Sequence, residues 1–177
     1  MKISKIFWIV HPAFTLDSYN GQPKHTSSEI DGIIEQLLTL AKRVAKDPNA
    51  IVAVVRTPFQ KATNELNQPR RKLLQIKETK MIKELKKTFG ERTLTSNEYA
   101  LAGTLDVTRQ LRQQMKKKGF EFSHTTRNIS TGSFLELCVR DYPNELIDYY
   151  SKTHKTKYKK VKPIKSASIR QKMTRHK

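Results

Sequence analysis

The side chains best suited to chemistry in this chain are one thiol, two imidazoles and one guanidinium, and they are widely separated in the sequence. Cys138 is the single cysteine, while His11, Arg56 and His124 each lie within or directly after a short apolar or β-rich segment. A thiolate acts as a nucleophile when an imidazole accepts its proton and a cation or hydrogen-bond donor supports the oxyanion. These residue types are therefore candidates for cysteine-dependent hydrolysis, provided that the fold brings them together.

Each candidate also has a plain structural interpretation. Cysteine is among the most buried residue types, and Cys138 falls on an apolar stripe with helical spacing, so it can be a packing residue. His11 before a proline is typical of a loop, and His124 can face solvent on an alternating segment. The histidines are far apart and no glycine-rich phosphate loop is present, so the sequence predicts neither a metal site nor a cofactor.

Short apolar runs alternate with longer amphipathic segments along the chain. Residues 5–10 (KIFWIV) and 50–55 (AIVAVV) are continuous apolar runs, which are typical of strands buried on both faces. Thr26-Ser-Ser-Glu29 has the pattern of a capping box and predicts the start of a helix. The other expected elements are helices at 70–87, from Thr104 to Gly119 and from about Ser133, the last kinked or divided at Pro143, and strands at 93–95 and 120–126.

This order predicts one three-layer α/β/α domain over residues 1–150, with a mostly parallel, Rossmann-like sheet. In such folds ligands bind beyond the carboxyl ends of the strands. The rule nominates His11 after the first strand, Arg56 after the second, His124 in the last strand, and the loop 127–133 that precedes Cys138.

Length and composition exclude several classes of protein. A chain of 177 residues suits a single domain with a proper core, and no apolar run approaches the length of a membrane helix. A single cysteine excludes an internal disulfide. The apolar run at 6–10 is too short for a signal peptide and predicts a strand instead, so a cytoplasmic location is expected.

The net charge of +19 is concentrated at the end of the chain, where residues 152–177 hold eleven Lys/Arg and no acid. We expect residues 151–177 to form a disordered basic tail. Flexible cations bind polyanions by releasing counterions, so the tail and the basic helix 70–87 are candidate nucleic-acid contacts. A solubilising tail, an acidic partner and an anionic membrane surface are the alternatives. The residues nominated for nucleic acid are Lys155, Lys157, Tyr158, Lys159, Lys160 and Lys162.

Residues 98–139 contain two short motifs in a familiar order. EYALAGTLDVTRQLRQQMKKKGFEF holds Gly103-Thr104-Leu105 at a helix start. TGSFLELCV holds Gly132 and Cys138-Val139, with five residues between the glycine and the cysteine. This stretch resembles the isochorismatase-like cysteine hydrolases, which include nicotinamidases. The resemblance implies an α/β fold, with Cys138 as the nucleophile.

The resemblance also implies a catalytic aspartate after the first strand and a lysine before the Gly-Thr helix, and both are missing. The first strand ends in Val10-His11-Pro12, and RTLTSNEY contains no lysine. One hypothesis is therefore a degenerate or rebuilt hydrolase of a small amide or ester. In it His11 replaces the aspartate as base, and Arg56 or His124 binds the substrate. The alternative is a non-enzymatic protein that binds nucleic acid.

Overall fold

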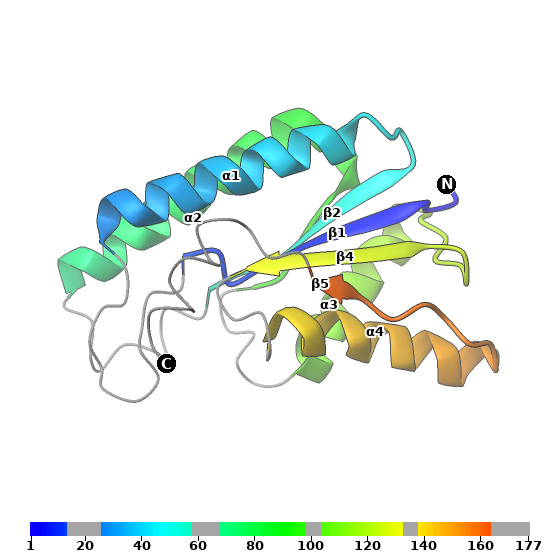
Figure 1. The fold of residues 1–177 in the computed structure, drawn as a ribbon. Coiled ribbons are helices and arrows are strands. Elements are labelled where there is room, and N and C mark those ends of the chain that lie inside the picture. Colours follow the sequence, from blue (N-terminus) through cyan, green and yellow to red (C-terminus); the bar gives the residue numbers. More distant parts are fainter. Residues whose placement is uncertain (14–25, 58–67, 98–103, 133–137, 164–177) are drawn as a thin grey trace.

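The protein was analysed as a computed structural model, which describes residues 1–13, 26–57, 68–97, 104–132 and 138–163. Its centre is a parallel sheet of five strands in the order β3-β2-β1-β4-β5, with helices on both faces (Figure 1). The predicted α/β fold with a mostly parallel sheet is confirmed. In chain order the elements are β1 (Lys5–Val10), α1 (Ser27–Ala45), β2 (Ala50–Val55), α2 (Gln68–Phe89), the 3-10 turn η1 (Gly90–Arg92), β3 (Thr93–Thr95), α3 (Thr104–Lys117), β4 (Arg127–Gly132), α4 (Cys138–His154) and β5 (Lys162–Pro163).

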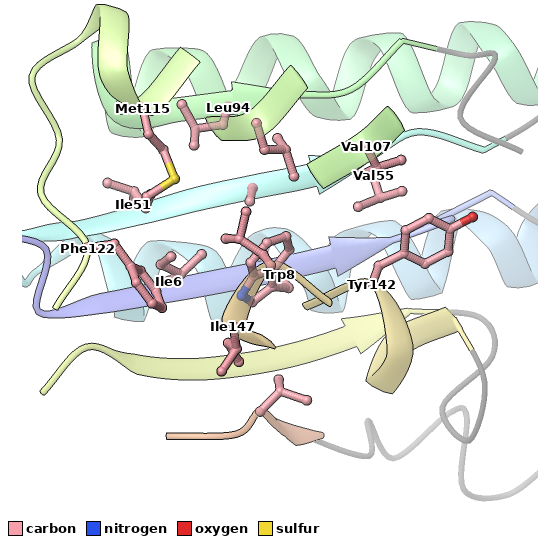
Figure 2. Packing of buried hydrophobic residues seen from close by; sticks show 14 of the residues in the cluster. Ile6, Trp8, Ile51, Val55, Leu94, Val107, Met115, Phe122, Tyr142 and Ile147 are labelled. Atoms are coloured by element: carbon pink, nitrogen blue, oxygen red, sulfur yellow. The ribbon is translucent and has the colours of Figure 1, made fainter. Parts of the chain in front are cut away.

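The two faces of the sheet have separate hydrophobic cores, because successive side chains of a strand point to opposite sides. Phe7 and Ile9 of β1 pack with α1 and α2, which lie above the sheet in Figure 1. The neighbouring residues Ile6, Trp8 and Val10 pack with α3 and α4 below it. Figure 2 shows Trp8 in the middle of this second core. Because the sheet has a core on each face, β1 is apolar at every position from Ile6 to Val10.

Helix α1 begins as predicted. The Thr26 side chain accepts a hydrogen bond from the Glu29 backbone N–H, and the Glu29 carboxylate accepts one from the Thr26 N–H, at 3.2 and 2.7 Å. This capping box satisfies N–H groups that have no partner within the helix.

The fourth strand is at 127–132, and the prediction of a strand at 120–126 is wrong. Arg127 to Gly132 pair with Lys5 to Val10, whereas the earlier segment makes only an isolated bridge between Glu121 and Lys2. The sequence RNISTG is nearly free of apolar residues and therefore resembles a loop. Within it, the buried Asn128 is accommodated because its Oδ1 accepts a hydrogen bond from Trp8 Nε1 at 3.1 Å.

The domain extends beyond the predicted boundary at residue 150. Helix α4 continues through Pro143, which is buried, to His154, and β5 then pairs with β4. Tyr158 and Val161 are buried, and the Tyr158 ring stacks on Phe122 with ring centroids 5.2 Å apart. Two apolar residues among many lysines give too weak a pattern to predict this packing. The rest of the expected tail, 164–177, lies outside the described residues.

Among the helices that the structure describes, none is long and apolar enough to cross a bilayer.

Gly132 allows β1 and β4 to approach closely at their carboxyl ends, and we expect it to be intolerant of any side chain. A Cβ atom at this position would lie 1.9 Å from the backbone oxygen of Val10, whereas one at Gly32 in α1 would meet nothing within 4 Å. Gly132→Ala should therefore lower the free energy of unfolding by about 2 kcal/mol or more. Gly32→Ala, the matched control, should raise it by about 0.5–1 kcal/mol, since alanine favours a helix interior. Urea unfolding followed by circular dichroism measures both, and an unaffected Gly132→Ala protein would contradict the packing of β1 against β4.

Candidate functional site

The carboxyl ends of β1 and β4 form a topological switch point, where ligands bind in open parallel sheets. The two strands are neighbours, but β1 leads to α1 on one face of the sheet and β4 leads to α4 on the other. The connections that leave this edge are long: 16 residues separate β1 from α1 and 12 separate β2 from α2, against 4 between α1 and β2. The sheet therefore supplies a rigid base for a site at this edge.

His11 occupies the switch point in an uncommon conformation. Its φ angle of 48° is in the left-handed region. Non-glycine residues adopt this conformation at a cost in free energy, and residues that do so are found preferentially at functional sites. Only 2% of its surface is exposed, and its ring meets the Tyr142 ring edge to face, with centroids 5.4 Å apart. Burial lowers the pKa of His11 from 6.5 to about 4, so the imidazole is uncharged at neutral pH.

Arg56 follows β2 but turns toward α2, away from the face on which His11 meets Tyr142. Its Nε donates to Glu78 Oε1 at 3.0 Å, and the Thr57 N–H donates to the other carboxylate oxygen at 2.9 Å. Glu78 is fully buried; burial raises its pKa, and the hydrogen bonds from Thr57 and Arg56 act in the opposite direction. This ion pair ties α2 to the end of β2.

Further hydrogen bonds hold the neighbouring strand ends together. The Arg56 N–H donates to Ser96 Oγ at 2.9 Å, and the Ala13 N–H donates to Thr57 Oγ1 at 3.2 Å. The first bond links the end of β2 to the residue after β3. The second links it to the segment after β1. The backbone at this edge is therefore fixed by side chains as well as by the sheet ladder.

Cys138 is the first residue of α4, which follows β4. The position therefore lies on the element that leaves the switch point, while its side chain lies outside the described part of the chain. Tyr142 stands four residues later, one helical turn along the same face of α4. Figure 2 shows Tyr142 beside the carboxyl end of β1. The helix face that carries position 138 is thus the face that His11 contacts.

His124 does not join this group. It is exposed in a turn that precedes β4, so it lies at the amino edge of the sheet, opposite to His11 and Arg56. The expectation that it shares a site with them depended on the misplaced fourth strand and is wrong. The structure therefore brings His11 near the start of α4, pairs Arg56 with Glu78, and leaves His124 elsewhere.

The nominated basic residues lie on the segment that joins α4 to β5 and on β5 itself. Lys155, Lys157, Lys159, Lys160 and Lys162 are exposed, as expected. Tyr158 is 7% exposed and stacked on Phe122, so its ring is not available for a nucleic-acid base.

The sequence analysis did not nominate Glu78 or Tyr142 as site residues. For Glu78, the sequence contains a pattern that could have indicated its role. Glu78 falls between Leu74 and Leu85 on the buried stripe of α2, where an acidic residue requires a buried partner. Tyr142 resembles an ordinary core residue, and only the course of β1 shows that it meets His11. The described residues contain no group of three or more His, Cys, Asp or Glu that could hold a metal ion.

Comparisons with protein-family models, curated proteins and solved structures gave no match to this chain. The resemblance of residues 99–139 to cysteine hydrolases therefore stays a prediction. The chemistry of the site has to be argued from its own residues.

We expect His11 to make the folded protein sensitive to mild acid. Its folded pKa is lower than its unfolded pKa, so the unfolded chain binds the proton more readily, and stability falls as the pH drops from 6.5 toward 4. Between pH 7 and pH 5 the loss should be about 2 kcal/mol. His11→Asn removes the titration and tolerates the left-handed backbone. Urea unfolding at the two pH values should show a smaller loss for His11→Asn; an equal loss would mean that other groups cause the acid sensitivity.

Proposed function

We propose that the protein is a cysteine-dependent hydrolase of small amides or esters, acting at the carboxyl edge of the sheet. Cys138 is the nucleophile and His11 the general base. The observation that carries the proposal is the contact between His11 and Tyr142, because Tyr142 lies one turn after Cys138 on the same helix face. The resemblance of residues 99–139 favours the same roles, with the base supplied by histidine in place of the family's aspartate.

Position 138 suits an activated thiol. The amino end of a helix carries a partial positive charge that stabilises an anion, and cysteines at this position have lowered pKa values. His11 is uncharged at neutral pH and can therefore accept a proton. A thiolate beside the ring would raise its pKa toward the range in which a general base works.

The reaction would proceed in two steps. The Cys138 sulfur attacks the carbonyl carbon of the substrate while His11 takes the thiol proton and passes it to the departing alcohol or amine. Water then attacks the thioester, which releases the carboxylic acid and restores the thiol. Arg56 supports the site indirectly, because its Nε is bonded to Glu78 and fixes the end of β2.

The first test is the rate at which native protein reacts with iodoacetamide between pH 5 and 9. An activated Cys138 should react with a midpoint well below 8.5, the value of an ordinary cysteine. Cys138→Ser should abolish both the labelling and any hydrolysis of p-nitrophenyl acetate. His11→Asn should slow the hydrolysis by about 100-fold or more.

His124→Asn is the matched control for the imidazole, because His124 is exposed at the opposite edge. It should leave both rates unchanged. Labelling of Cys138 only after denaturation would mean that it is a packing residue, and the hydrolase proposal would then be abandoned.

A further inference from the structure

A basic groove lies at the outer edge of the sheet. At this edge β5 lies beside β4 (Figure 1). Its volume is about 480 Å³. Four of the six residues that line it carry a positive charge, and the described lining includes no acidic side chain. We call it the β4–β5 groove; it is lined by Arg127, Asn128, Ile129, Lys159, Lys160 and Lys162.

The backbone that carries the lysines of the β4–β5 groove is held in place by the fold. The Val161 N–H donates to Asn144 Oδ1 at 3.1 Å, and Asn128 Nδ2 lies 3.4 Å from the Lys159 carbonyl oxygen. Tyr158 anchors the same segment, since its hydroxyl lies 2.6 Å from His154 Nδ1 and its ring packs on Phe122. Because these backbone positions are ordered before binding, the protein loses less conformational entropy when a ligand binds.

The positive charge of the β4–β5 groove is only partly compensated. Lys160 forms an ion pair with Asp148 of α4, and both side chains are about half exposed. Arg127, Lys159 and Lys162 are exposed, and no ion pair is recorded for them within the described residues. Three exposed cations therefore line one concave surface and make it a favourable place for an anion.

We propose that the β4–β5 groove binds the phosphodiester backbone of nucleic acid without regard to sequence. Lysine and arginine neutralise phosphates and release condensed counterions, which supplies affinity for any sequence. Tyr158, the one residue nominated for stacking on a base, is buried and cannot do so. The groove therefore favours contacts to the phosphate backbone of the nucleic acid over contacts to its bases. The proposal does not rest on the hydrolase, because the groove and position 138 lie on different parts of the fold.

Other anionic partners fit the β4–β5 groove less well. A bilayer surface is broad and cannot enter a concave groove, and Ile129, the one apolar residue in the lining, is half-buried rather than free to insert. A peptide could in principle extend the sheet at its edge. However, β5 has only two residues and one of them is Pro163, which lacks the N–H that a new strand would need.

The test is fluorescence anisotropy with a labelled 20-base-pair DNA duplex, titrated with full-length protein over a range of salt concentrations. The variant Arg127→Gln/Lys159→Gln/Lys162→Gln should weaken binding by roughly 10- to 100-fold. It should also reduce the slope of log K against log salt by about 0.9 for each lost contact. The matched control is Arg109→Gln/Lys116→Gln/Lys117→Gln, which removes the same charge from exposed positions of α3.

The control variant should bind within a few-fold of the unmodified protein, and Cys138→Ser should bind normally. Equal losses in the two triple variants would show that binding follows net charge alone, and this would overturn the proposal. It would also be overturned if the groove variant lost binding to heparin or to phosphatidylglycerol vesicles while its affinity for DNA was unchanged. Thermal unfolding of each variant verifies that a loss of binding is not a loss of fold.

Discussion

The structure depends on the burial of β1 and β2 on both faces. Every residue from Ile6 to Val10 and from Ala50 to Val55 is buried, so each strand needs a helix above it and another below. Parallel strands meet this need because each crossover carries a helix onto one face. The chain makes its first two crossovers on one face and the next two on the other. The switch point between β1 and β4 follows from this change of side.

Two polar side chains in this apolar framework are matched by specific partners. Asn128 accepts the Trp8 N–H inside one core, and Glu78 accepts from Arg56 and from Thr57 inside the other. A buried polar group without such partners would cost free energy that the apolar contacts could not easily offset. The bonds to Glu78 also fix the end of β2, so part of the order at the carboxyl edge comes from the same requirement.

Much of the fold could be predicted from the sequence, because its central strands and three of its helices have strong local patterns. The capping box at Thr26 and the apolar runs of β1 and β2 predicted their elements closely. The sequence RNISTG gave no such signal, since β4 takes its place from pairing with β1 rather than from its own side chains. The position of Tyr158 likewise depends on its contact with Phe122, which is distant in sequence. The contact between the His11 and Tyr142 rings also joins residues that are far apart in the sequence, so local patterns could not predict it.

The two proposed sites lie at opposite ends of one strand, β4. Gly132 ends β4 at the switch point beside Val10, and Arg127 begins it at the β4–β5 groove. At about 3.3 Å per residue the two positions are roughly 17 Å apart along the strand. A ligand in the groove therefore need not cover His11, and a small substrate at the switch point need not displace a bound polymer. The two proposals therefore place their sites at separate ends of β4, and a variant at one site tests that proposal without altering the residues of the other.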